Sequence, residues 1–314
     1  MFKKILTYLT ICTTLLAGLP LIASAANGTP VKPVVDTAID QVSSTGSVNW
    51  DTGVIEACGI GVPSSIAKSP AQARLMTRRA AIADAQRNLL EAIGGIKVTA
   101  ETTVRNFETT SDIVNTQVFG IVRGAKIVDE QLLPDGTYQV TLQVALFGKG
   151  GLSEIITNAT KPAAPVPLPQ PSTSYKPVPL PIYTGLVVDV TGLPISRAMS
   201  PVIFDETGRA IYGHINIIPE FAVSQGMMDY LCTPEDIRSL ELGQSRAGDK
   251  PIVVKAIALR DNNVNIIISQ TDADTILDAD VLGNFLAKAK VAVKQYQLTA
   301  PAPKNNPQKI TKKK

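Results

Sequence analysis

Side chains that commonly carry enzymatic chemistry are scarce in this chain of 314 residues. It has one histidine, His214, one tryptophan and three cysteines. A metal site or an imidazole acid–base pair needs partner residues of matching type, and no second histidine is present. Ser69, Ser172 and Ser224 lack the Gly-x-Ser-x-Gly surroundings of a hydrolase nucleophile. We therefore expect a protein that is not an enzyme, with no catalytic residues and no cofactor, and we interpret His214 as a surface or strand-end residue.

Two other patterns resemble ligand sites, but each lacks residues that the chemistry needs. Four aspartates lie close together in the sequence, at Asp272, Asp274, Asp278 and Asp280. A calcium loop would need a central glycine and a final glutamate at fixed spacing, so we interpret Asp272 and Asp274 as residues that favour a helix N-terminus. Gly59-x-Gly61 lacks the third glycine of a dinucleotide loop, and we interpret it as a bulge or strand end. No metal site is expected.

The cysteines are too few and too far apart to predict a disulfide framework. Cys12 lies inside an apolar run and follows Ile11, where lipid-modifying enzymes need a small residue, so we expect no lipidation. Cys58 and Cys232 fall in what we predict to be different domains. They could pair in an oxidising compartment, but two separate buried thiols are the favoured interpretation.

The N-terminus has the three parts of a secretory signal peptide. Lys3 and Lys4 precede an uncharged, apolar-rich run over residues 5–22, and Ala23-Ser24-Ala25 has the small-x-small form that signal peptidase accepts. The run is short for a bilayer span of roughly 20 residues. We predict cleavage after Ala25 and a mature protein in the periplasm or at the periphery of the outer membrane.

Positive charge is concentrated at the two ends of the chain. The last 11 residues contain no acid and five lysines, namely Lys304, Lys309, Lys312, Lys313 and Lys314. The part of the chain between the signal peptide and this tail is slightly acidic, so no basic face for nucleic acid is expected. The tail either contacts an anionic surface, at roughly 1 kcal/mol per lysine near a charged membrane, or acts as an inert solubilising segment.

A proline-rich stretch, residues 161–182, divides the chain. Eight of its 22 residues are proline, which lacks the backbone donor that helices and sheet interiors need. We expect an extended, semi-stiff spacer. The predicted division is a signal peptide 1–25, a flexible leader 26–45, a first domain 46–160, the linker 161–182, a second domain 183–298 and a disordered lysine-rich tail 299–314.

The clearest local signal in the first domain is a helix. Ser69-Pro70-Ala71-Gln72 supplies an N-cap serine, a proline at the first helical position and a capping-box glutamine, and Gly94-Gly95 supplies a stop. The predicted apolar face consists of Leu75, Ile82, Ala85, Leu89 and Ile93. Arg78 and Arg79 fall at or inside this face, so either their stems pack while their charged ends reach water, or they mark a partner surface.

Strands are expected on both sides of the linker. In the first domain they are residues 49–61, 96–106, 121–133 and 138–146, with a turn at Pro134-Asp135-Gly136. In the second domain they are residues 186–190, a hairpin over 202–212, a hairpin of 250–259 with 264–269, and 291–298. A helix is expected to begin at Thr271 or Asp272. The predicted fold class is α+β, with two small α/β-sandwich-like domains.

One part of the first domain resembles a known family. The resemblance rests on Arg79-Ala80-Ala81, Asp84-Ala85, Arg87-Asn88-Leu89-Leu90-Glu91, Gly95-Ile96-Lys97-Val98 and Asp135-Gly136-Thr137-Tyr138. This pattern is similar to the LPP-twenty lipoprotein family, whose domain also forms the N-terminal part of flagellar assembly protein T. It covers about residues 47–150. The resemblance implies an α+β domain in the cell envelope and no catalytic residues.

These observations predict an exported, non-enzymatic envelope protein. The first hypothesis is an assembly or interaction role with other envelope proteins, with the flagellar base as one setting. The alternative is a periplasmic binding module for cell-wall polymer or anionic lipid that uses the tail and a sheet face.

Overall fold

The computed structural model describes residues 38–162 and 166–295. The predicted signal peptide with Ala25, most of the leader and the five lysines of the tail lie outside these residues. The described chain divides into two units. The first runs to Ile96 and resumes from Thr103 to Ile155, whereas the second takes Lys97–Thr102 and the chain from Ile156 onwards. The α+β class predicted from the sequence is confirmed.

The first unit is built on an antiparallel sheet with strand order β1-β2-β3-β5-β4. Its strands are β1 (Ile39–Gln41), β2 (Gly46–Asn49), β3 (Val54–Gly61), β4 (Lys126–Leu132) and β5 (Tyr138–Ala145). The predicted strand over residues 138–146 is confirmed as β5. The register of edge strand β4 shifts between Ile127 and Asp129, and every residue of β4 is exposed.

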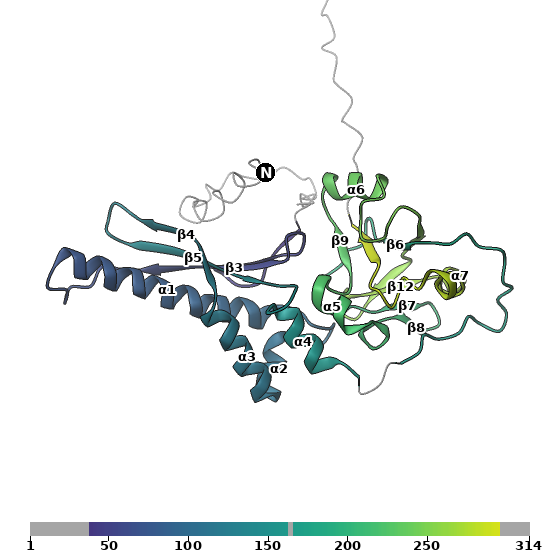
Figure 1. Ribbon diagram of the computed structural model, residues 1–314, viewed down its shortest axis with the longest axis horizontal. Coiled ribbons are helices and arrows are strands. Elements are labelled where there is room, and N and C mark those ends of the chain that lie inside the picture. Colours follow the sequence, from purple (N-terminus) through teal and green to yellow (C-terminus); the bar gives the residue numbers. More distant parts are fainter. Residues whose placement is uncertain (1–37, 163–165, 296–314) are drawn as a thin grey trace, which may run out of the picture. The chain divides into compact units, whose positions relative to one another are not determined.

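Helix α1 (Pro70–Gly95) lies along one face of this sheet (Figure 1). The Ser69 hydroxyl accepts a hydrogen bond from the Gln72 amide at 3.2 Å, and the Gln72 side chain accepts one from the Lys68 amide at 2.7 Å, which confirms the predicted start. The buried residues of α1 itself are Thr77, Ala81, Ala85, Leu89, Ala92, Ile93 and Gly94. The predicted face was wrong at Leu75, which is 65% exposed, because small residues spaced by four positions face the sheet instead.

The pair Gly59 and Gly61 explains how closely α1 approaches β3. A Cβ atom on Gly59 would lie 2.0 Å from the Ala85 amide nitrogen, and one on Gly61 would lie 2.1 Å from the Thr77 carbonyl oxygen. The pairing of β3 with β5 is regular through both positions. Of the two interpretations, the bulge was therefore wrong, whereas the strand end is right for Gly61, the last residue of β3. The glycines are needed because the helix backbone occupies the space of a side chain.

The strand predicted at residues 96–106 was wrong, and the one predicted at residues 121–133 was right only over residues 126–132, which form β4. Residues 97–102 form bends and a tight turn rather than a strand. The Val98 amide closes this turn by donating a hydrogen bond to the Thr102 carbonyl at 2.9 Å. Thr103 then begins α2 (Val104–Thr110), capped through Asn106. Residues 121–123 belong to α3 (Asp112–Arg123), which buries valines four residues apart. Both α2 and α3 pack against α1, and α4 (Leu152–Thr160) follows β5.

The second unit contains two four-stranded sheets. The first has order β10-β6-β13-β9 and is entirely parallel, with β6 (Gly185–Asp189), β9 (Asp229–Leu231), β10 (Pro251–Lys255) and β13 (Val291–Lys294). The second has order β11-β12-β7-β8, with β7 (Ile203–Asp205), β8 (Ala210–Tyr212), β11 (Ala258–Arg260) and β12 (Asn265–Ile268). The β7–β8 hairpin and helix α7 (Gln270–Gly283) agree with the sequence prediction.

The prediction of a hairpin between residues 250–259 and 264–269 was only partly right. β11 pairs with β12 around a turn at residues 261–263, whereas β10 leaves that hairpin and pairs in parallel with β6. Helices α5 (Pro219–Gln225) and α6 (Pro234–Glu241), the short 3-10 helix η3 (His214–Asn216) and strand β9 were not predicted.

The described residues of the proline-rich segment form neither helix nor strand, as their prolines predict. The segment is nevertheless not a free spacer along its whole length. Residues 166–175, which we call the strap, are hydrogen-bonded to the rest of the second unit. The strap contacts a cluster of three charged side chains, two of which are buried.

Candidate functional site

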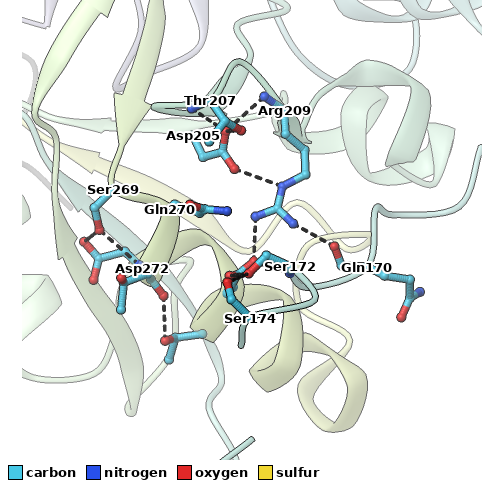
Figure 2. Close-up of polar contacts among 12 residues, drawn as sticks. Gln170, Ser172, Ser174, Asp205, Thr207, Arg209, Ser269, Gln270 and Asp272 are labelled. Atoms are coloured by element: carbon cyan, nitrogen blue, oxygen red, sulfur yellow. Dashed lines mark hydrogen bonds and ion pairs between the residues drawn. The ribbon is translucent and has the colours of Figure 1, made fainter. Parts of the chain in front are cut away.

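A cluster of three charged side chains lies beneath the strap (Figure 2). Asp205 ends β7, Arg209 stands in the β7–β8 hairpin, and Asp274 lies in α7. The side chains of Asp205 and Asp274 are 0% and 4% exposed, and that of Arg209 is 22% exposed. Buried charges are costly unless they are paired and hydrogen-bonded, so their partners decide what this cluster can do.

Asp205 organises the hairpin. One of its oxygens accepts hydrogen bonds from the Thr207 amide at 2.9 Å, the Thr207 hydroxyl at 2.6 Å and the Arg209 amide at 3.0 Å. The other accepts from Arg209 Nε at 2.9 Å. Burial alone would raise the pKa of Asp205, but these hydrogen bonds outweigh burial and hold the pKa below its usual value. The arrangement fixes the Arg209 guanidinium in one orientation.

Asp274 receives both the arginine and the strap. Its Oδ1 accepts from Arg209 Nη2 at 2.6 Å and from the Ser172 amide at 2.8 Å, and its Oδ2 accepts from the Ser172 hydroxyl. Burial again opposes ionisation, yet the hydrogen bonds from Ser172 and Arg209 keep the pKa of Asp274 below its usual value. Asp274 is therefore a carboxylate that holds Ser172 through both of its oxygens.

Further contacts extend along the strap. Arg209 Nη1 donates to the Gln170 carbonyl at 2.7 Å, as Figure 2 shows. The Tyr175 hydroxyl donates to Asp278 at 3.0 Å. At the other end, the Asn216 amide group donates to the Val166 carbonyl at 3.0 Å, and the Val166 amide donates to the backbone carbonyl that precedes Asn216 at 3.3 Å. The strap is thus bound at both ends and in its middle.

This geometry favours binding over catalysis. A general acid or base works best with a pKa near the operating pH, whereas the hydrogen bonds hold the pKa values of Asp205 and Asp274 below their usual range. The acceptor oxygens and guanidinium nitrogens described above are also occupied by protein partners. The cluster is therefore suited to holding an extended chain segment.

The other predicted acidic residues point to separate partners. Asp272 exchanges hydrogen bonds with Ser269 at the start of α7, at 2.8 and 3.1 Å, which fits the N-terminal interpretation. Asp280 accepts from the Phe285 and Leu286 amides at 2.7 and 2.8 Å and closes the end of α7. In the part of the chain that the structure describes, no group of three or more potential ligands of the His, Cys, Asp or Glu type has the geometry of a metal site.

The arginines of α1 have different environments. Arg78 forms an ion pair with Glu130 of β4, with Nη2 2.8 Å from the carboxylate, whereas Arg79 is exposed. Arg78 thus reaches the sheet edge, and the hypothesis of a partner surface stays open for Arg79. His214 is half-buried at the start of η3, and burial lowers its pKa.

The two described cysteines, Cys58 and Cys232, are not joined by a disulfide. Cys58 is half-buried and its sulfur accepts a hydrogen bond from Gln139 Nε2 at 3.1 Å, while Cys232 is buried. The structure therefore favours the interpretation of two separate thiols.

Two polar residues of α1 have a role that the sequence did not reveal. β2 pairs with only the first half of β3, and the last backbone hydrogen bond on this side joins the Cys58 amide to the Thr45 carbonyl at 3.0 Å, so the edge of β3 is open beyond that point. There Asp84 accepts a hydrogen bond from the Ile60 amide at 2.9 Å, and Asn88 Nδ2 donates to the Cys58 carbonyl at 2.7 Å. Neither residue belongs to the apolar face that helical spacing predicted for this helix. They satisfy the sheet edge instead.

Comparison with known families finds one match in each unit. Residues 58–145 match the LPP20 lipoprotein family, so the chain contains an LPP20-type α+β domain, as the sequence predicted. Residues 185–294 match the second domain of Treponema pallidum Tp0624. No curated protein matches the chain. The likeness to flagellar assembly protein T stays a prediction.

The LPP20 match indicates an exported, envelope-associated protein. Among the helices of residues 38–162 and 166–295, none has the length and apolar character required to cross a bilayer.

Proposed function

We propose that this chain is an exported, non-enzymatic protein of the bacterial cell envelope that acts in assembly by binding other envelope proteins. The LPP20-type domain carries this proposal, because it associates the chain with envelope lipoproteins. The periplasm or the periphery of the outer membrane is its proposed location, and the flagellar base is one setting for it.

The use of the polar residues supports an interaction role. Asp84 and Asn88, which belong to the family-like pattern, serve the sheet edge. The charged cluster of the second unit holds the strap. On the surface, α3 exposes Ile113 (71%) and Phe119 (51%). Exposed large apolar side chains on one helix are suited to protein contact.

The flagellar version is tested by deleting the gene and measuring swimming in soft agar, with a plasmid-borne copy as control. If the protein acts at the flagellar base, the deletion reduces motility and the plasmid restores it. Normal flagella and normal swimming in the deletion strain would contradict this setting.

The general interaction role is tested by placing a photo-crosslinking residue at Phe119, with Gly120 as the matched position on the same helix. Crosslinks to defined envelope proteins from Phe119 support the proposal. Failure of Phe119 to capture any envelope protein in living cells would contradict α3 as the contact surface.

An alternative function is binding of cell-wall polymer or anionic lipid through the lysine-rich tail. This rests on the five tail lysines, Lys304, Lys309, Lys312, Lys313 and Lys314. Purified protein would then sediment with peptidoglycan or with vesicles of an anionic phospholipid, and high salt would release it. Retention that survives deletion of residues 304–314 would remove the tail from this argument.

A further inference from the structure

The strap is bound to the second unit in the way that a peptide ligand is bound. Its Ser172 presents an amide and a hydroxyl to the two oxygens of Asp274. Its Gln170 carbonyl accepts from Arg209, and its Tyr175 hydroxyl donates to Asp278. Extended segments are commonly recognised through their backbone groups, with a few side chains adding specificity.

The side chains that receive the strap are held mainly by the rest of the second unit. Asp205 orients Arg209 through Nε and the hairpin backbone. Asp274 and Asp278 stand on α7, which has its own N-cap at Ser269. The strap itself has little internal structure: its backbone closes a single turn, from the Tyr175 amide to the Ser172 carbonyl at 3.0 Å. The receiving surface is therefore largely preformed, and the strap is the adaptable partner.

The requirements of this surface define its ligand. It takes an extended segment with a free carbonyl, a serine two positions later and a tyrosine three positions after the serine, as at Gln170, Ser172 and Tyr175. A second copy of this chain carries that pattern by definition. Exchange between two copies would replace each of these hydrogen bonds with an identical one, which is the basis of domain swapping.

We propose that the surface formed by Arg209, Asp274 and Asp278 binds the strap of a second copy of this chain, so that copies associate by strap exchange. The strap of the same chain competes at an effective concentration on the order of millimolar. Exchange is therefore suppressed in dilute solution and favoured at high local concentration. This inference is independent of the proposed function.

The experiment uses a fluorescent peptide of residues 166–176 and the full-length chain in two forms. One form is the wild type, and the other carries S172A and Y175F, which weaken the chain's own strap and leave the receiving surface intact. Binding is measured by fluorescence anisotropy. We expect the peptide to bind the double variant about 10- to 100-fold more tightly than the wild type, because hydrogen bonds to charged groups are lost from the competing strap.

Two controls test the specificity of this binding. Adding D274N to the S172A/Y175F variant should abolish the gain in peptide affinity over the wild type. A peptide with alanine at the position of Ser172 should bind the S172A/Y175F variant no more tightly than it binds the wild type. Circular dichroism establishes that each variant is folded. No binding to a folded double variant at millimolar peptide would overturn the proposal, as would equal binding of the alanine peptide or of an unrelated proline-rich peptide.

The association itself is followed by light scattering coupled to size-exclusion chromatography. The wild-type chain should form dimers at high protein concentration, and D274N should shift it toward monomers. A wild-type chain that stays monomeric at every concentration would overturn strap exchange.

Discussion

At the scale of single residues, the chain uses its polar groups to complete its own structure. Asp84 and Asn88 satisfy the open edge of β3, and Asp274 holds Ser172. Glycine has a comparable role at Gly59, where α1 leaves no room for a Cβ atom. The predictions at this scale therefore concern stability, and each substitutes one such residue.

Gly59→Ala should destabilise the first unit by about 1–3 kcal/mol, because the new methyl group meets helix backbone that cannot move without lifting α1 from β3. Urea denaturation followed by circular dichroism measures this. Gly120→Ala is the control, since a Cβ atom there has nothing within 4 Å. Equal stability of G59A and the wild type would show that α1 does not rest on this glycine.

The charged cluster predicts a pH dependence. Burial would raise the pKa of Asp274, but Ser172 and Arg209 hold it below its usual value. The resulting stabilisation is complete above pH ~4, the usual pKa of an unfolded aspartate, and is lost as the pH falls through the lower folded pKa. Asp274→Asn should lower the free energy of unfolding by about 2 kcal/mol at pH 7. The variant should also lose less stability than the wild type as the pH falls. Urea titrations from pH 7 to pH 2 compare the stability of the wild type with that of the variant. If the two stabilities fall in parallel with pH, Asp274 is not the source of the pH dependence.

At the scale of elements, local signals were easier to predict than pairing. The start of α1 could be predicted because its cap and proline are adjacent in sequence. β10 was placed in the wrong sheet because its parallel partner β6 lies far away in the sequence. The strap was missed for the same reason, since Ser172 and Asp274 are 102 positions apart. Composition predicts that a proline-rich segment is extended, but it does not show which surface binds it.

The edge of β3 gives a prediction at this scale. Asp84→Ala should expose the Ile60 amide to hydrogen exchange and lower stability by about 1–3 kcal/mol, because a backbone donor loses its acceptor. Asp84→Asn keeps an acceptor oxygen and should lose less. Glu91→Ala, on the exposed face of the same helix, is the matched control. Unchanged exchange at Ile60 in D84A would contradict the edge role.

At the scale of the whole molecule, the sequence and the family match agree on the envelope. Mass spectrometry of protein from the envelope fraction should find a mature chain that begins at Ala26, without a lipid, because Cys12 lacks the small residue that lipidation requires. A lipid-modified N-terminal cysteine, or a full-length chain in the cytoplasm, would contradict this prediction. The sequence hypothesis that Arg79 marks a partner surface stays a prediction, because the exposure of a side chain does not identify a partner.

The irregular edge strand β4 has a consequence for solubility in a crowded compartment. The strand exposes Ile127, Val128 and Leu132, but its shifted register and its charges at Lys126, Asp129 and Glu130 disfavour the addition of a further strand. This edge of the sheet therefore ends at β4 instead of growing from molecule to molecule. Growth of fibres through this edge is therefore disfavoured, and specific contacts are left to other surfaces.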